Sequence, residues 1–237
     1  MRWSFCKENI TKYLTRKSKI LVVGPSILEV NFFSEMKYQD ITFGIHSKND
    51  LKSLSTNNKF NNFNFIRMDA RDIKFKDNYF DYSFANAVLH HIDLPHLAFC
   101  ELYRISKKGI LVIEGNDSLI MRISSRFGFS EEYEKSATIN ENGGVLDSST
   151  PNYVYRWKER EVKKLFNSYD PKMIHKIYFR YDFYVKNENL KRMHNNFKLI
   201  TRSILEKFLN IFLFIFKKQG NLLSIYIDKK NSYKRID

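Results

Sequence analysis

Two neighbouring histidines are the residues of this sequence best suited to acid–base chemistry. His90 and His91 directly follow a short apolar stretch that ends at Leu89. Because imidazole titrates near neutral pH, either ring could take the proton of a hydroxyl group within hydrogen-bonding reach. We therefore predict that His91 and His90 are catalytic, with Glu114 and Asp117 as weaker candidates for the base. A structural role, in which one ring caps or packs beneath the following helix, explains the histidines equally well.

A group of aromatic and basic residues further along the chain could bind an acceptor molecule. Tyr153, Tyr155 and Arg156 lie within four positions of one another. A guanidinium group can hold an anion through two parallel hydrogen bonds. We predict that these three side chains bind the substrate. The alternative is that they anchor their own loop to the rest of the domain.

These side chains can act together only if the fold brings them to one place, and the apolar pattern predicts how. Short apolar segments typical of buried strands alternate with segments of helical periodicity. The strands are predicted at 20–23, 41–45, 63–68, 79–85 and 109–114, and the helices at 27–36, from 50 onwards, and at 94–105. Strands that alternate with helices at this spacing form βαβ units around a parallel sheet.

The rest of the chain extends this core. A helix over 157–169 and a long helix over about 188–216 are predicted, with strands at 172–184 and 222–227 as an antiparallel edge pair. The whole is predicted to be a single α/β domain, a Rossmann-like, doubly wound, mainly parallel sheet of about seven strands. Helices would cover both faces, and one edge strand would be antiparallel. Its predicted parts are a leading helix (1–17), a cofactor-binding core (18–125), a loop-rich insertion (128–156) and C-terminal helices and edge strands (157–237).

In an open parallel sheet, ligands bind at the carboxyl ends of the strands, so the residues that follow each strand are candidates for binding. Gly24 follows the first predicted strand, where a missing Cβ permits a tight turn and a close approach to a ligand. Ser26 is a plausible N-cap of the next helix, whose free N–H groups could meet an anion.

The next three strands are also followed by polar residues. His46 could reach a ribose hydroxyl, although an exposed loop histidine is an equal alternative. The carboxylate of Asp69 could accept a hydrogen bond from an adenine amino group, while the backbone near Ala70 pairs with a ring nitrogen. Asn86 would lie over the centre of the cleft. Together with the first turn, these residues are predicted to bind a cofactor.

The charge, the cysteine content and the apolar runs of the sequence indicate which partners and which cellular locations are possible. The net charge is +14, and residues 186–237 hold 12 Lys or Arg against 4 Asp or Glu. This charge keeps an anionic substrate, an RNA or an anionic membrane open as partners. Two cysteines, Cys6 and Cys100, and the lack of any CxxC spacing predict neither a disulfide framework nor a metal site, and favour the reducing cytoplasm. The apolar run 208–216 is too short to span a membrane, although peripheral contact by 197–216 stays open.

One stretch resembles a known family. FIRMDARDIKFKDNYFDYSFANAVLHHIDLPHLAFCELYRISKKGILVIE is similar to the central half of a class I S-adenosylmethionine-dependent methyltransferase of the type 11 domain family. The likeness rests on three segments of the sequence. They are Asp69-Ala70 to Phe80-Asp81, Leu89-His90-His91, and Glu101 to Ile105 with Lys108-Gly109. The likeness covers roughly residues 18–125. It implies S-adenosylmethionine as the cofactor and methyl transfer as the activity.

Later segments, including Gly143-Gly144 and Pro151 to Trp157, are similar to a bacterial subgroup associated with glycan or cell-surface gene clusters. A small molecule or a glycan precursor is therefore the expected acceptor. The first loop departs from the family, because Val22, Ser26 and Leu28 replace an acidic residue and two glycines, and His46 replaces a second acidic residue. This departure leaves activity in question. It keeps a catalytically silent binding module, and an RNA-directed methyltransferase, as alternatives.

Overall fold

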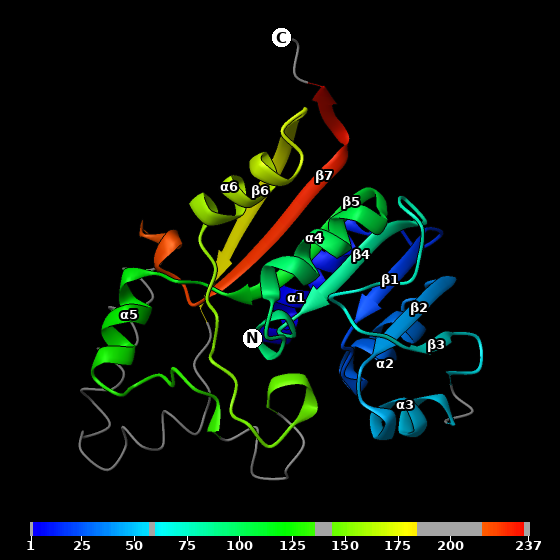
Figure 1. Cartoon of the computed structure of the whole chain (residues 1–237), viewed down its shortest axis with the longest axis horizontal. Coiled ribbons are helices and arrows are strands. Elements are labelled where there is room, and N and C mark those ends of the chain that lie inside the picture. The colour runs from blue at the N-terminus through cyan, green and yellow to red at the C-terminus, as the bar shows by residue number, and fades with distance from the viewer. Residues whose placement is uncertain (1, 57–59, 136–143, 184–214, 235–237) are drawn as a thin grey trace.

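Seven strands form one sheet in the computed structural model, which describes residues 2–56, 60–135, 144–183 and 215–234 (Figure 1). The strands are β1 (Lys19–Val23), β2 (Asp40–Ile45), β3 (Asn64–Arg67), β4 (Phe80–Asn86), β5 (Ser106–Gly115), β6 (Met173–Asp182) and β7 (Leu222–Lys234). Their order across the sheet is β3-β2-β1-β4-β5-β7-β6. Strands β1 to β5 run parallel, and β7 is antiparallel to both of its neighbours. The sheet therefore has the Rossmann-like, doubly wound order predicted from the sequence.

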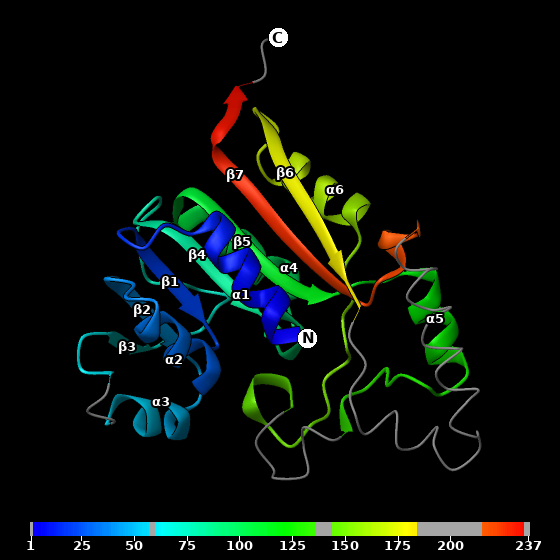
Figure 2. The ribbon, with the colours of Figure 1, turned by 180° about the vertical axis from the view of Figure 1, so that it is seen from behind.

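Helices cover both faces of this sheet. They are α1 (Arg2–Tyr13), α2 (Ile27–Glu35), α3 (Lys48–Ser55), α4 (Pro95–Ile105) and α6 (Glu159–Tyr169). Helix α5 (Leu119–Arg126) has no buried residue and does not cover the sheet. Helices α4 and α6 lie on the face of the sheet that is turned to the viewer in Figure 1. Helices α1 and α2 lie on the opposite face, which Figure 2 turns to the viewer. The chain thus winds outwards from β1 through β2 to β3 and returns through β4 to the other side of β1.

The apolar strand segments explain why both faces are covered. Successive side chains of a strand point to opposite faces, so a run without polar residues needs a partner layer on each side. In β1, Ile20 and Val22 belong to the hydrophobic cluster shared with α1 and α2, while Leu21 and Val23 belong to the cluster shared with α4 and α6. The same alternation recurs in β5, whose Leu111 joins the first of these clusters.

The strand order fixes where a ligand can bind. Sheet order reverses between β1 and β4, because the connections after these two strands leave in opposite directions. A crevice forms at the carboxyl ends of the strands at such a switch point. The predicted cofactor-binding residues follow β1, β2 or β3 or, in the case of Asn86, end β4, so the topology gathers them at one edge of the sheet.

Several boundaries differ from the predictions. Helix α5 was not predicted, and β7 continues to Lys234 because its outer half still pairs with Met173 and Ile174 of β6. The predicted helix over 188–216 lies almost wholly outside the described residues, and with it the segment considered for membrane contact. Within the described part of the chain, none of the helices has the length and apolar character needed to cross a membrane.

The aromatic core behind β1 and β2 yields a stability prediction. Phe33 is fully buried and meets the rings of Phe43 and Phe84 edge-on. Phe33→Ala should lower the free energy of unfolding by about 3–5 kcal/mol, because it leaves a cavity in a packed core. Phe127→Ala removes an identical side chain that is 68% exposed, and should change stability by less than about 0.5 kcal/mol. Urea denaturation measures both, and equal losses would contradict this description of the core.

Candidate functional site

A cavity of about 260 Å³ opens at the carboxyl ends of β1, β2, β3 and β4. Four of the predicted cofactor-binding residues line it, namely Gly24, His46, Asp69 and Ala70. Apolar side chains complete the walls, among them Ile45, Met68, Val88 and Ile92. The cavity therefore combines an apolar slot with carboxylates and imidazoles, which is the composition expected of a small-molecule site.

Gly24 makes the sharp turn out of β1. Its φ of +57° lies in the left-handed region, and its N–H donates to the carbonyl of Gly44 at 2.9 Å. A Cβ built at this position would lie 2.2 Å from Cγ2 of Val88. Val88 thus occupies the space that any side chain at position 24 would need. The single glycine retained in this loop is the one that the local backbone requires.

Ser26 and Asn86 do not line the cavity but are joined next to it by a buried carboxylate. Ser26 is the N-cap of α2, as predicted, and forms a capping box with Glu29. Glu29 is 4% exposed and also accepts a hydrogen bond of 2.6 Å from Nδ2 of Asn86. That bond fixes the amide so that its Oδ1 is presented as an acceptor. This Oδ1 is buried and has no hydrogen-bond partner among the described residues.

Asp69 is held by an arginine rather than standing alone. Arg71 donates to both carboxylate oxygens of Asp69 and extends through its other amino group to Asp93 at 2.8 Å. The hydrogen bonds from Arg71 lower the pKa of Asp69 to about 2, although partial burial opposes the shift. Asp69 is therefore a fixed anion at neutral pH, and a carboxylate can accept more bonds than Arg71 supplies.

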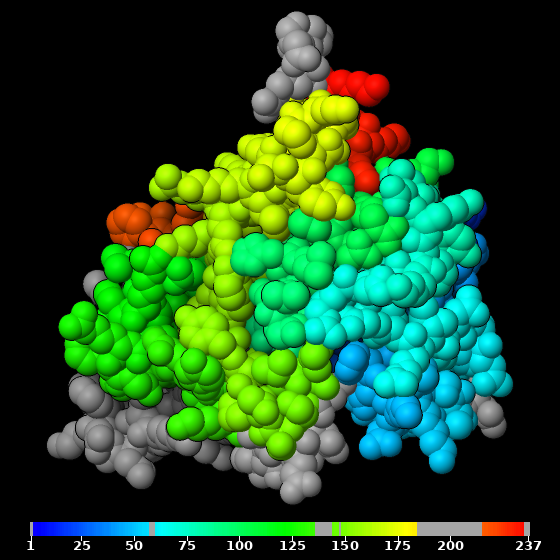
Figure 3. All heavy atoms as spheres, viewed as in Figure 1, coloured from blue at the N-terminus to red at the C-terminus, as the bar shows by residue number. Residues whose placement is uncertain are grey.

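Asp50 and Leu146 are two of the lining residues that the sequence analysis did not identify. Asp50 lies in the first turn of α3, where its N–H is capped by the hydroxyl of Ser47 at 3.2 Å. The Ser-x-x-Asp spacing that begins α3 was the signal available for it. Leu146 comes from the insertion, and its φ of +51° places it in the left-handed region. Figure 3 shows the yellow-green part of the insertion next to the blue and cyan N-terminal half of the chain. No local sequence signal predicts that contact.

The predicted catalytic histidines lie at the other side of the cavity, where Glu114 determines their position. Glu114, at the end of β5, is fully buried and accepts hydrogen bonds from the backbone N–H groups of Val88 and Leu89. Its second oxygen lies 2.7 Å from Nδ1 of His90. Burial lowers the pKa of His90, but the carboxylates of Glu114 and Glu134 outweigh it and raise this pKa to about 9.

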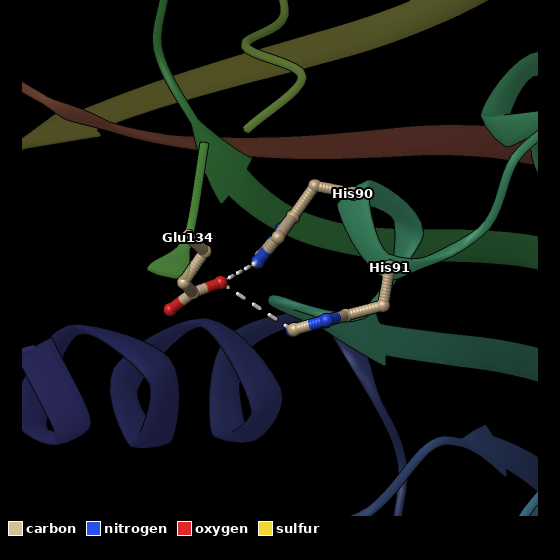
Figure 4. Close-up of side chains that lie close together, drawn as sticks. All are labelled: His90, His91 and Glu134. Atoms are coloured by element: carbon tan, nitrogen blue, oxygen red, sulfur yellow. Dashed lines mark ion pairs between the residues drawn. The ribbon is translucent and has the colours of Figure 1, made fainter. Parts of the chain in front are cut away.

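Glu134 brings the insertion to the histidines. One of its carboxylate oxygens lies 3.5 Å from Nε2 of His90 and 3.7 Å from Nε2 of His91 (Figure 4). Its backbone N–H donates to the carbonyl of Asn152, whose side chain donates to the carbonyl of His90. The nearby ring of His90 lowers the pKa of Glu134 to about 2 against the effect of burial. His91 also lines the cavity, whereas His90 lies behind it.

The three predicted substrate-binding residues do not line this cavity. Tyr155 donates its hydroxyl to Glu161, and one amino group of Arg156 donates to the carbonyl of Glu131 at 2.7 Å. Tyr153 is half exposed and meets Tyr133 edge-on. Arg156 and Tyr153 thus contact other residues of the insertion, and only the Tyr155 bond joins it to α6. A substrate-binding role for these three residues stays a prediction.

Part of the sequence matches a known domain, and the fold resembles that of solved structures. Residues 32–113 match a family model described as a methyltransferase domain. YcgJ of Bacillus subtilis is 13% identical, with 100% of this chain and 98% of that chain covered and a TM-score of 0.56. A SAM-dependent methyltransferase of Thermotoga maritima is also 13% identical, with 95% and 88% covered and a TM-score of 0.54. The [4+2]-cyclase SpnF is 12% identical, with 95% and 80% covered and a TM-score of 0.58. None of the curated proteins compared with the sequence matches it.

The turn at Gly24 gives a prediction with an internal control. Gly24 and Gly128 both have positive φ, where an added side chain costs roughly 1–2 kcal/mol. At Gly128 nothing lies within 4 Å of the new Cβ, whereas at Gly24 it would collide with Val88. Gly24→Ala should therefore lose about 1–3 kcal/mol more of the unfolding free energy than Gly128→Ala. Adding Val88→Ala should restore part of this difference. Equal losses in urea denaturation of the two single variants would refute the proposed role of Val88.

Proposed function

We propose that this chain, a class I methyltransferase by its fold and by the domain at residues 32–113, binds S-adenosylmethionine in the cavity beside β1 and β4. It would transfer the methyl group to a small molecule or a glycan precursor. The cavity carries this proposal, because its acceptors match the donors of such a cofactor. The methyltransferase domain model and the likeness to SAM-dependent methyltransferases support it.

The residues present fit the cofactor in four respects. Asp69 is a fixed anion beside an apolar slot, which suits the amino group and ring of adenine, with the backbone of Ala70 next to it. The orphaned Oδ1 of Asn86 suits a donor such as an ammonium group. Gly24 lets the backbone approach the ligand, and Ser26 begins the helix whose N-terminal dipole favours a carboxylate. His46 and Asp50 line the same cavity and are proposed to bind the ribose hydroxyls.

S-adenosylmethionine supplies an electrophilic methyl group on a sulfonium with a good leaving group. The protein then has to align the acceptor and exclude water. Well-oriented reactants can gain roughly 7–11 kcal/mol from proximity alone. His91, at the cavity wall, and His90, held by Glu114, are the proposed catalytic residues on the acceptor side. Tyr153, Tyr155 and Arg156 are proposed to contact the acceptor from the insertion.

Two observations keep alternatives in view. The fold also carries a protein named as a [4+2]-cyclase, so the architecture by itself does not fix methyl transfer. A catalytically silent binding module is therefore the main alternative. The net charge of +14 motivates an RNA-directed enzyme as a second alternative, which steep salt dependence of RNA binding would support. A cytoplasmic location is proposed as well, because a chain with only two cysteines and no CxxC motif is typical of a reducing compartment.

The first test is isothermal titration of the full chain with S-adenosylmethionine and S-adenosylhomocysteine. Micromolar binding is expected, and Asp69→Ala should weaken it by at least tenfold, because hydrogen bonds to charged groups contribute about 1.5–3 kcal/mol. Asp72→Ala is the control, since that carboxylate pairs with Lys74 and does not line the cavity. A folded protein that gives no heat at millimolar ligand would favour the silent module instead.

Asp50 offers a second test of the same cavity. The carboxylate is proposed to accept the ribose hydroxyls in place of the acidic residue that the family has where this chain has His46. Asp50→Asn should therefore lower the affinity for S-adenosylhomocysteine by roughly tenfold. Asp40→Asn, at the opposite and exposed end of β2, should leave this affinity unchanged. An unaltered affinity in Asp50→Asn would remove Asp50 from the site.

A further inference from the structure

We propose that His90, His91 and Glu134 form a binding site for a divalent transition-metal ion beside the cofactor cavity. One nitrogen of each imidazole and one carboxylate oxygen all lie within 4.8 Å of one another. In Figure 4 the three side chains converge from two segments, the histidines after β4 and Glu134 from the insertion. The two segments are far apart in the sequence, so no ligand spacing could have predicted this site.

The distances favour a shared ion over a direct ion pair. A charge-assisted hydrogen bond between nitrogen and carboxylate oxygen is about 2.7–2.9 Å long. The same oxygen of Glu134 lies 3.5 Å from His90 Nε2 and 3.7 Å from His91 Nε2. Two ligands of one tetrahedral zinc ion, each about 2.0–2.1 Å from the metal, are about 3.3 Å apart. The observed separations are close to that value.

The buried oxygen of Glu134 is an independent observation. Its Oε2 is buried and has no hydrogen-bond partner among the described residues. A buried carboxylate oxygen without a partner is costly, and such an atom calls for an ion or another bound group. The hydrogen bond from its backbone to Asn152 holds Glu134 in place, so this oxygen is fixed beside both imidazoles.

Glu114 supplies the second shell that metal-binding histidines need. A ligating histidine usually donates its other ring N–H to a carboxylate, which fixes the tautomer and the ring orientation. His90 has this arrangement, since its Nδ1 lies 2.7 Å from Glu114 while its Nε2 is turned towards Glu134. Glu114 is itself held by two backbone N–H groups, so the ring is positioned by the end of β5.

The donor set indicates the class of ion and its use. Two imidazoles and one carboxylate suit Zn²⁺ and other first-row transition ions, whereas Mg²⁺ and Ca²⁺ prefer oxygen ligands. Three protein ligands leave a coordination position for an exogenous oxygen, as in catalytic zinc sites. Because His91 also lines the cavity, that position would suit an acceptor hydroxyl. This use of the ion rests on the proposed function, but the existence of the site does not.

The test is titration of the chelator-treated, untagged full chain with Zn²⁺, and with Co²⁺ followed by visible absorption, in the absence of S-adenosylmethionine. One ion should bind per chain with micromolar or tighter affinity. His91→Ala and Glu134→Gln should each weaken Zn²⁺ binding by at least tenfold, and Glu114→Gln by about 10- to 100-fold. Circular dichroism checks folding. His91→Ala and Glu134→Gln change partly exposed residues, and these two variants test the metal site by themselves if Glu114→Gln fails to fold.

His96→Ala is the matched control. Its ring also pairs with a glutamate, Glu161, at 2.9 Å, but lacks a second histidine, so this variant should bind Zn²⁺ like the parent chain. Equal affinity of the parent chain, His91→Ala and Glu134→Gln would overturn the proposal. A loss in His96→Ala as large as in His91→Ala would also overturn it. Glu134→Gln should keep its affinity for S-adenosylhomocysteine, so failure of the metal site and failure of the cofactor site give different results.

Discussion

The buried carboxylate of Glu114 is the interaction on which the whole site depends. Its three hydrogen bonds join the end of β5 to the backbone after β4 and to the ring of His90. Burial raises the pKa of Glu114, but His90 and the backbone N–H of Leu89 outweigh it, so this pKa lies below its usual value. Removing one partner of a buried ion pair costs about 3–5 kcal/mol, because the other charge is left uncompensated. The geometry of the turn and of the histidine is therefore fixed by a single side chain.

The fold could be predicted from the sequence because its signals are local. Apolar segments such as Ile20–Val23 have no polar residue that could face water, so they require a layer on both sides, and their alternation with helices fixes a parallel sheet. The candidate site was only partly predictable, because many of its contacts join segments that lie far apart in the sequence. Residues such as Asp69 directly follow a strand and could be found by position. The partners that give them their properties come from distant segments.

The pairing of Glu29 with Asn86 illustrates what local patterns omit. The sequence shows that the acidic residue expected near the end of β1 is replaced by Val22. It does not show that a glutamate in α2 turns back to bond Asn86 at the end of β4. In the same way, two parts of the insertion pair at Glu134 and Asn152, and the side chain of Asn152 bonds the carbonyl of His90. Both contacts depend on tertiary packing, which no periodicity or short motif encodes.

The histidine cluster also bears on whether the degenerate first loop means a silent protein. A fold kept only as a scaffold gains little from a partly buried cluster of two imidazoles and two carboxylates, since desolvation offsets most of the attraction between buried charges. Well-packed apolar residues at the positions of this cluster would stabilise the fold at least as well. Strongly perturbed groups beside a cavity are instead what binding and catalytic sites require. Because His91 of this cluster lines the cavity, the cluster supports the proposed active protein over the silent module.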